Sequence, residues 1–236
     1  VDVQFASVGG GANDTGGSVT MQLDGLKYRS SGGTVTTSNG LSTSTYTGSA
    51  FYDVKGYPTF TNAALPTTVL APGLQTLFRT DLSATGGQIA WNDITFTVAS
   101  NSANGTFGPA ATGWKLYENG SDITGFATVA SVSDIGATTR VEFVFGTERA
   151  VAAGSSVRLE LKTTVGGTLA TGDYVTTQIA NPSTTTVTTL SSTVQYNKGA
   201  SFVWTDQSHP IHTTATDDWF TDGMVKSLID SQTLTK

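Results

Sequence analysis

A two-residue alternation of apolar and polar side chains constrains the fold of this chain more than any other feature. The clearest example is residues 157–162, where Val and Leu alternate with Arg, Glu and Lys, and the same period recurs in 94–98, 114–117 and 141–145. Side chains of a β-strand point alternately to its two faces, so each segment is typical of a strand with one buried and one wet face. Such strands recur roughly every ten to fifteen residues, which indicates an antiparallel β-sandwich with immunoglobulin-like, Greek-key connections.

The two ends of the chain differ from this pattern, and we predict three regions. Residues 1–50 combine an alternating strand at 1–8, a Gly-rich linker and a hairpin; residues 51–201 form the sandwich; and residues 202–236 form a tail rich in aromatic and acidic side chains. Within this tail, residues 217–229 carry an apolar stripe at helical spacing and are the only helix candidate. The chain is thus predicted to be all-β, with an N-terminal strand-plus-hairpin extension and an irregular C-terminal tail.

Composition narrows the possible functions. The chain has no Cys, which excludes disulfides and cysteine-based nucleophiles or metal sites. Its net charge of −6 disfavours nucleic acid, whose phosphates require clustered Lys and Arg. No apolar run approaches the length of a membrane span, and no charged-plus-apolar leader opens the sequence. We therefore expect either that a leader was removed before Val1 or that the chain is cytosolic.

The tail also carries a resemblance to known proteins. Its motifs are Trp204-Thr205-Asp206-x-Ser208, His212-Thr213, Thr216-x-Asp218-Trp219 and Gln232-Thr233-Leu234. Together they resemble a C-terminal signature of large secreted surface proteins of candidate-phylum bacteria, and upstream segments resemble the sandwich repeat that precedes it. The resemblance covers about residues 51 to 236. It implies an extracellular role at the cell envelope and supplies no catalytic residues.

Acidic side chains in the tail could bind a divalent cation. Carboxylates suit hard cations, so Asp206, Asp217, Asp218 and Asp222 are candidate calcium ligands. The alternative is a solvated acidic surface or a capping role, and we expect no obligatory cofactor.

A Ser/His/Asp set for nucleophilic catalysis is also available in the tail, from Ser208, His212 and Asp218. It lacks a Gly-x-Ser-x-Gly elbow and a Gly-rich oxyanion loop, which favours side chains that bond the backbone of an irregular tail. Paired carboxylates of a glycosidase cannot be singled out among the acidic residues either. We therefore predict that the chain is not an enzyme.

Aromatic side chains offer a third kind of site. Trp91 and Trp114, with Phe107 and Tyr117, could form a platform that stacks on sugar rings. Aromatic residues of a sandwich more often fill its core, because each buries a large apolar area.

The first strand suggests self-assembly. Val1, Val3 and Phe5 alternate with polar residues, and a Gly-rich linker tethers them loosely to the rest of the chain. Such a strand could pair with a neighbouring subunit, with these residues as anchors, or it could complete its own sandwich. A third interpretation makes residues 1–50 the remnant of a preceding repeat.

Tryptophans of the tail could provide a second docking element. Trp204 and Trp219 could anchor the tail on the next subunit or on their own domain.

These observations predict an extracellular structural subunit that forms a cell-surface filament or layer, a homopolymer with no membrane span and no nucleic-acid partner. The alternatives are a module or adhesin that binds carbohydrates or surfaces, including surface glycans, and a secreted hydrolase.

Overall fold

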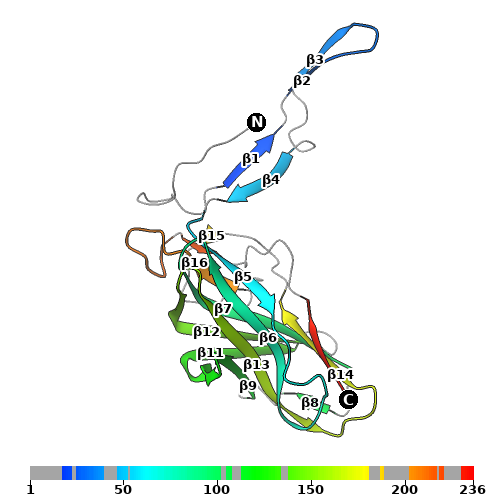
Figure 1. The fold of residues 1–236 in the computed structure, drawn as a ribbon, viewed down its shortest axis with the longest axis vertical. Helices are drawn as coiled ribbons and strands as arrows, with labels where there is room; N and C mark the ends of the chain where they lie inside the picture. The colour runs from blue at the N-terminus through cyan, green and yellow to red at the C-terminus, as the bar shows by residue number, and fades with distance from the viewer. Residues whose placement is uncertain are drawn as a thin grey trace.

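The chain forms a β-sandwich of two antiparallel sheets, which confirms the predicted fold class (Figure 1). It is seen in a computed structural model that describes residues 18–22, 25–39, 47–52, 54–101, 105–107, 113–133, 138–180, 187–188, 202–216, 218–220 and 230–236. The elements are β1 (Ser18–Gln22), β2 (Gly25–Arg29), β3 (Val35–Asn39), β4 (Thr47–Tyr52), β5 (Tyr57–Asn62), β6 (Gly73–Thr85), β7 (Ile89–Ser100), β8 (Gly105–Phe107), β9 (Trp114–Glu118), β10 (Ser121–Asp122), the 3-10 helix η1 (Thr124–Phe126), β11 (Ala127–Ser133), β12 (Thr138–Val151), β13 (Ser156–Gly167), β14 (Tyr174–Ile179), β15 (Val187–Thr188), β16 (Phe202–Thr205), β17 (Trp219–Phe220) and β18 (Gln232–Thr235).

The first sheet has the strand order β10-β9-β13-β6-β5, and β8 pairs with the end of β13. Its outer face carries ion pairs, among them the paired contacts from the Arg158 guanidinium to the Asp81 carboxylate at 2.8 and 2.9 Å. Glu160 accepts from both Arg79 and Lys162. The polar positions of the 157–162 pattern therefore do face outward, and they form a ladder of neutralised charges.

The second sheet has the order β11-β12-β7-β16-β17-β15, and β14 and β18 extend it beside the far half of β7. The long strand β7 has different partners along its length, since Ile94 and earlier residues pair with β16 whereas Phe96 and later residues pair with β14. The strands of each sheet are not all consecutive in sequence, because the chain crosses between the two sheets after β6, β7, β10, β12 and β13. These crossings are the connections that a Greek-key sandwich requires.

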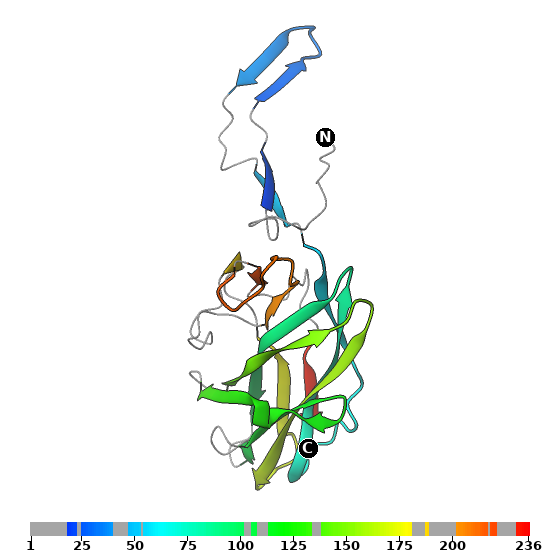
Figure 2. The ribbon, with the colours of Figure 1, turned by 90° about the vertical axis from the view of Figure 1, so that its left-hand side faces the viewer.

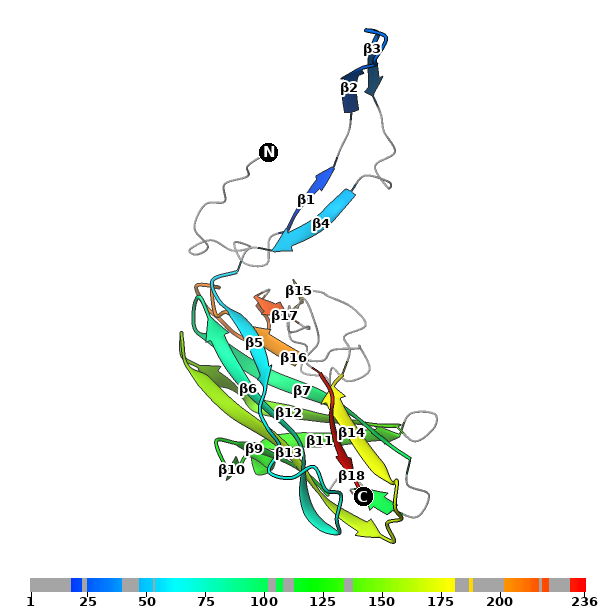
Figure 3. The ribbon, with the colours of Figure 1, turned by 45° about the vertical axis from the view of Figure 1, so that its right-hand side comes forward.

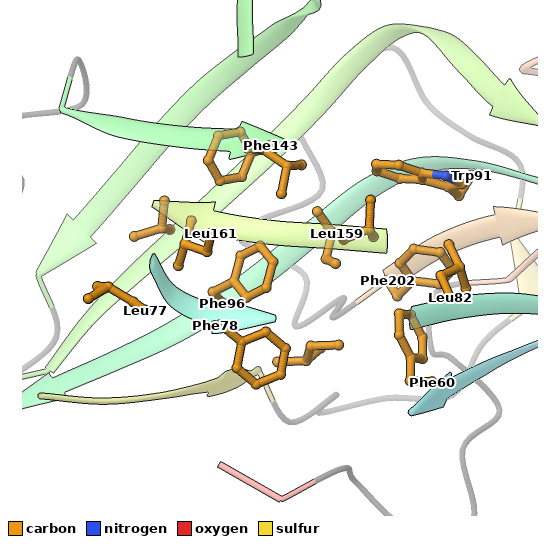
Figure 4. Close-up of a cluster of buried hydrophobic side chains, with 14 of the residues drawn as sticks. Phe60, Leu77, Phe78, Leu82, Trp91, Phe96, Phe143, Leu159, Leu161 and Phe202 are labelled. Carbon is orange, nitrogen blue, oxygen red and sulfur yellow. The ribbon is translucent and has the colours of Figure 1, made fainter. Parts of the chain in front are cut away.

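The core lies between the sheets and is rich in aromatic side chains (Figure 4). Phe60 meets Phe202 edge to face with ring centroids 4.9 Å apart, and Trp91 stacks on Phe202 at 5.8 Å. Such aromatic pairs add to the free energy gained from the apolar area that they bury. Phe202, from the C-terminal segment, is therefore a central member of the core.

The C-terminal segment is more ordered than the predicted irregular tail. Its described residues contribute β16, β17 and β18 to the second sheet, and residues 206–216 form a loop between β16 and β17. Trp219 and Phe220 lie in β17, so the predicted helix at 217–229 is wrong at these two positions; the remaining positions, apart from Asp218, lie outside the described residues. Pairing with β16 overrides the helical spacing there, because a strand at this place buries both aromatic side chains.

Strands β1 to β4 form a separate arm at one end of the sandwich (Figures 1 to 3). In this arm β1 pairs with β4 and β2 pairs with β3, and neither pair joins a sheet of the sandwich. The predicted hairpin is thus present as β2 and β3. No helix among the described residues has the length and apolar character needed to cross a membrane.

Candidate functional site

His212 lies at the centre of a hydrogen-bonded cluster on the loop between β16 and β17. Its Nδ1 is 2.8 Å from an Asp218 carboxylate oxygen, and its Nε2 is 2.9 Å from a Glu148 carboxylate oxygen. Both ring nitrogens therefore face carboxylate oxygens, and the doubly protonated imidazolium is the form of His212 that donates to both at once. We call Asp218, His212 and Glu148 the clasp, because it joins the C-terminal loop to β12.

Asp218 is the most heavily bonded member of the clasp. Besides His212, its carboxylate accepts from the Thr205 hydroxyl at 3.1 Å, the His209 N–H at 3.3 Å and the Thr216 hydroxyl. Burial alone would raise the pKa of Asp218, but the hydrogen bonds from His212 and Thr216 outweigh it and lower the pKa to about 2. The carboxylate is thus held ionised inside the protein.

Burial and hydrogen bonding also oppose each other at His212, but each shifts its pKa in the direction opposite to that for Asp218. Burial opposes the charged imidazolium, but hydrogen bonds to Asp218 and Glu148 outweigh this effect and raise the pKa of His212. The indole of Trp219 lies against the imidazole with ring centroids 5.2 Å apart, and its N–H donates to the Thr213 carbonyl at 3.0 Å. The clasp is therefore fixed from several directions.

A shallow cavity of about 230 Å³ adjoins the clasp and is lined in part by Asn92, Thr147, Glu148 and His212. Catalysis there would need a nucleophile within reach of the imidazole. Ser208 does not fill this role, because its hydroxyl donates to Asp206 at 2.7 Å while both nitrogens of His212 are engaged by carboxylates. The structure brings His212 and Asp218 together and leaves Ser208 out.

Asp206 belongs to a neighbouring set of contacts that closes the sandwich at the arm end. Its carboxylate accepts from the Lys55 N–H at 2.8 Å and from the N–H and hydroxyl of Ser208. Burial raises the pKa of Asp206, and the hydrogen bonds oppose this rise. Asp206, which follows β16, is thereby hydrogen-bonded to Lys55 in the segment that leads into β5.

The candidate calcium ligands are only partly described. Asp206 and Asp218 direct their oxygens to N–H and O–H donors of the protein, and Asp217 and Asp222 lie outside the described residues. Among the residues that the structure describes, no three His, Asp or Glu side chains are grouped to hold a metal ion. Calcium binding at these four residues stays a prediction.

A second cluster of titratable groups is formed by Asp93 and Glu142 on the outer side of the second sheet. Glu142 pairs with Thr95, two residues from Asp93, and both carboxyl groups are almost completely buried. Burial and the neighbouring Glu142 raise the pKa of Asp93 well above its usual range, and burial likewise raises the pKa of Glu142. Two such groups favour sharing one proton over carrying two charges. Sequence alternation placed Glu142 outward and did not reveal that this face is covered.

The tryptophans are all buried within their own chain. Trp91 and Trp204 have no exposed surface, and Trp114 and Trp219 are 1% exposed. Trp91 and Trp114 therefore offer no free face to a sugar ring, and the core interpretation holds for both. The side chain of Phe107 lies outside the described residues, while Tyr117 lies beneath the Lys162 ammonium, 4.1 Å from the ring centroid.

The burial of Trp204 and Trp219 shows which surface these two side chains contact. Trp204 stacks on Phe220 with centroids 4.4 Å apart, and Trp219 packs with Val203. Both anchor the C-terminal segment on its own domain, which is one of the two alternatives predicted for them. The other proposed anchors, Val1, Val3 and Phe5, lie outside the described residues.

Fold and site together define a β-sandwich whose C-terminal segment is locked into the second sheet by buried aromatic rings and an ionised clasp. No protein-family model and no curated protein matches the chain. Among solved structures it is similar to the major pilin SpaA of Corynebacterium diphtheriae, with 12% identity and a TM-score of 0.21. That alignment covers 64% of this chain and 38% of the pilin, and a similarity this weak carries no argument about function.

Proposed function

We propose that the chain is an extracellular structural subunit that self-assembles into a cell-surface filament or layer. In this proposal the N-terminal strand pairs with a sheet of a neighbouring subunit and not with a sheet of its own sandwich, and Val1, Val3 and Phe5 are its anchors. Strand addition supplies backbone hydrogen bonds for affinity, and alternate side chains fix the register. Donation from head to tail is heterologous, so it generates an open filament unless the rotation closes a ring.

The observation that carries the proposal is the arm formed by β1 to β4. Its strands pair only with each other among the described strands, and every residue from 27 to 37 is exposed. Tyr28 and Val35 are among these residues, at 50% and 46% exposure. A two-stranded ribbon is marginally stable in water unless a further surface covers it. A neighbouring subunit would provide that surface and hold the N-terminal strand close to its acceptor.

Two further features support a structural role. The clasp engages both imidazole nitrogens of His212 with carboxylates, which suits a lock better than a catalyst. The C-terminal motifs resemble those of secreted surface proteins, which favours a location at the cell surface.

Deletion of residues 1–8 tests strand donation, with the point substitution Phe5→Lys as a milder variant. We expect both to give folded monomers in size-exclusion chromatography with light scattering, because each removes anchors from the acceptor sheet. Gln4→Lys is the matched control, because the sequence alternation assigns residue 4 to the face opposite Val3 and Phe5, so this substitution should leave assembly unchanged. Continued polymerisation of the deletion variant would show that the N-terminal strand is not the donor.

A further inference from the structure

Strand donation needs an acceptor edge, and the edges of the sandwich differ greatly in how well they could serve. Natural proteins protect exposed edges with short strands, charged side chains or proline. An edge without such protection is able to pair with another chain.

Most described edges of the two sheets are protected in these ways. In the first sheet, β5 contains Pro58, and β10 is only two residues long. In the second sheet, β15 is also two residues long, and β18 is bridged on its free side by the segment around Val69. None of these edges offers a long, free row of backbone groups.

The strand β11 is different. It spans seven residues, Ala127–Ser133, and its sequence ATVASVS contains no charge and no proline. It pairs along its whole length with β12, and no described strand pairs with its other edge. Its backbone therefore presents an unprotected template at the end of the second sheet.

The core is also incompletely closed beside β11. Ala127 and Val129 lie opposite the buried residues Phe145 and Phe143, yet both are only partly buried where they pack against the core. Phe126, immediately before the strand, is 70% exposed. Apolar side chains of an added strand would cover these groups, since successive inward positions of neighbouring strands lie side by side.

We infer that the free edge of β11 accepts the N-terminal strand of a second copy of this chain. The donor segment VDVQFASV has eight residues and so is long enough to pair with all seven residues of β11. In this pairing its Val1, Val3 and Phe5 fall on the same face as the partly buried Ala127 and Val129. Gln4 then falls on the outer face, beside Thr128. This inference rests on the proposed donation and specifies its acceptor.

Crosslinking between two single-cysteine chains tests the acceptor, because the natural chain has no Cys. A Gln4→Cys chain is mixed with a Thr128→Cys chain, allowed to assemble, and treated with a short bis-maleimide reagent that tolerates a slip of one register step. The matched control replaces Thr128→Cys by Thr61→Cys, because Thr61 is also an exposed threonine and lies on the edge strand β5. Thermal melting of each variant checks that the fold is unchanged.

We expect the crosslinked heterodimer to be several-fold more abundant with Thr128→Cys than with Thr61→Cys. Equal or stronger crosslinking at Thr61→Cys would overturn β11 as the acceptor while leaving strand donation intact. Polymers that form without crosslinking at either position would also overturn it. A mixture that stays monomeric would instead contradict the proposed function, and the acceptor with it.

Discussion

Neutralising Asp218 should remove a defined part of the stability of the protein. The substitution Asp218→Asn preserves the size of the side chain but abolishes the charge that faces His212 at 2.8 Å. The pKa of Asp218 falls from its usual value of 3.8 to about 2 in the folded protein. At about 1.4 kcal/mol per pKa unit, this difference corresponds to about 2 kcal/mol of folding free energy.

The sign of the pH dependence follows from the direction of this pKa change. A carboxyl group whose pKa is lowered by folding stabilises the folded state above its unfolded pKa, and this contribution is lost as the pH falls toward the folded pKa. The natural protein should therefore lose about 2 kcal/mol between pH 5.5 and pH 2 through this group alone, and Asp218→Asn should not.

Urea denaturation followed by tryptophan fluorescence at several pH values between 5.5 and 2 measures this difference. We expect Asp218→Asn to be less stable by about 2 kcal/mol at pH 5.5 and to converge with the natural protein near pH 2. Asp230→Asn is the control, because the Asp230 side chain is exposed and only its carbonyl oxygen contacts Asn62. Parallel stability curves for Asp218→Asn and the natural protein would refute the role of the clasp.

Three further predictions concern the clasp, the core and the buried acid pair. Folding raises the pKa of His212, so its contribution to the free energy of unfolding is complete below the usual pKa of 6.5 and is lost as the pH rises through the raised pKa. The urea midpoint of His212→Gln should therefore change less with pH over that range than the midpoint of the natural protein. Phe202→Ala should reduce the free energy of unfolding by about 3–5 kcal/mol in urea titration, because it opens a cavity beside Trp91, whereas Phe126→Ala at the surface should change it by less than about 0.5 kcal/mol. Asp93→Asn should raise the melting temperature at pH 7 and have little effect below about pH 4, because the raised pKa of the buried carboxyl costs stability as the pH rises; an unchanged or lower melting temperature at pH 7 would contradict it.

The sandwich strands could be predicted from the sequence because their signal is local. The alternation in 157–162, 94–98 and 141–145 lies within β13, β7 and β12, and in each the apolar positions face the core. Only neighbouring residues are needed to detect a two-residue period. The period also identified Arg158, Glu160 and Lys162 as the outward positions of β13, although it did not identify the ion pairs that they form.

Features that depend on contacts distant in sequence could not be predicted. Glu148 precedes His212 by 64 residues, and no local motif indicates that the end of β12 that carries Glu148 meets the C-terminal loop. The pairing of β16 with β7 likewise decides that Trp204 is buried, since the sequence around Trp204 is equally compatible with an exposed anchor. Alternation assigns Asp93 and Glu142 to the outer face of a sheet but cannot tell whether that face is covered.

Electron microscopy of the purified full chain beside its Phe5→Lys variant tests the central claim most directly. If the N-terminal strand completes the sheet of a neighbouring subunit, the full chain forms filaments or layers and the Phe5→Lys variant forms single particles. Dispersed single particles in both samples, or the same polymers in both, would contradict strand donation as the basis of assembly.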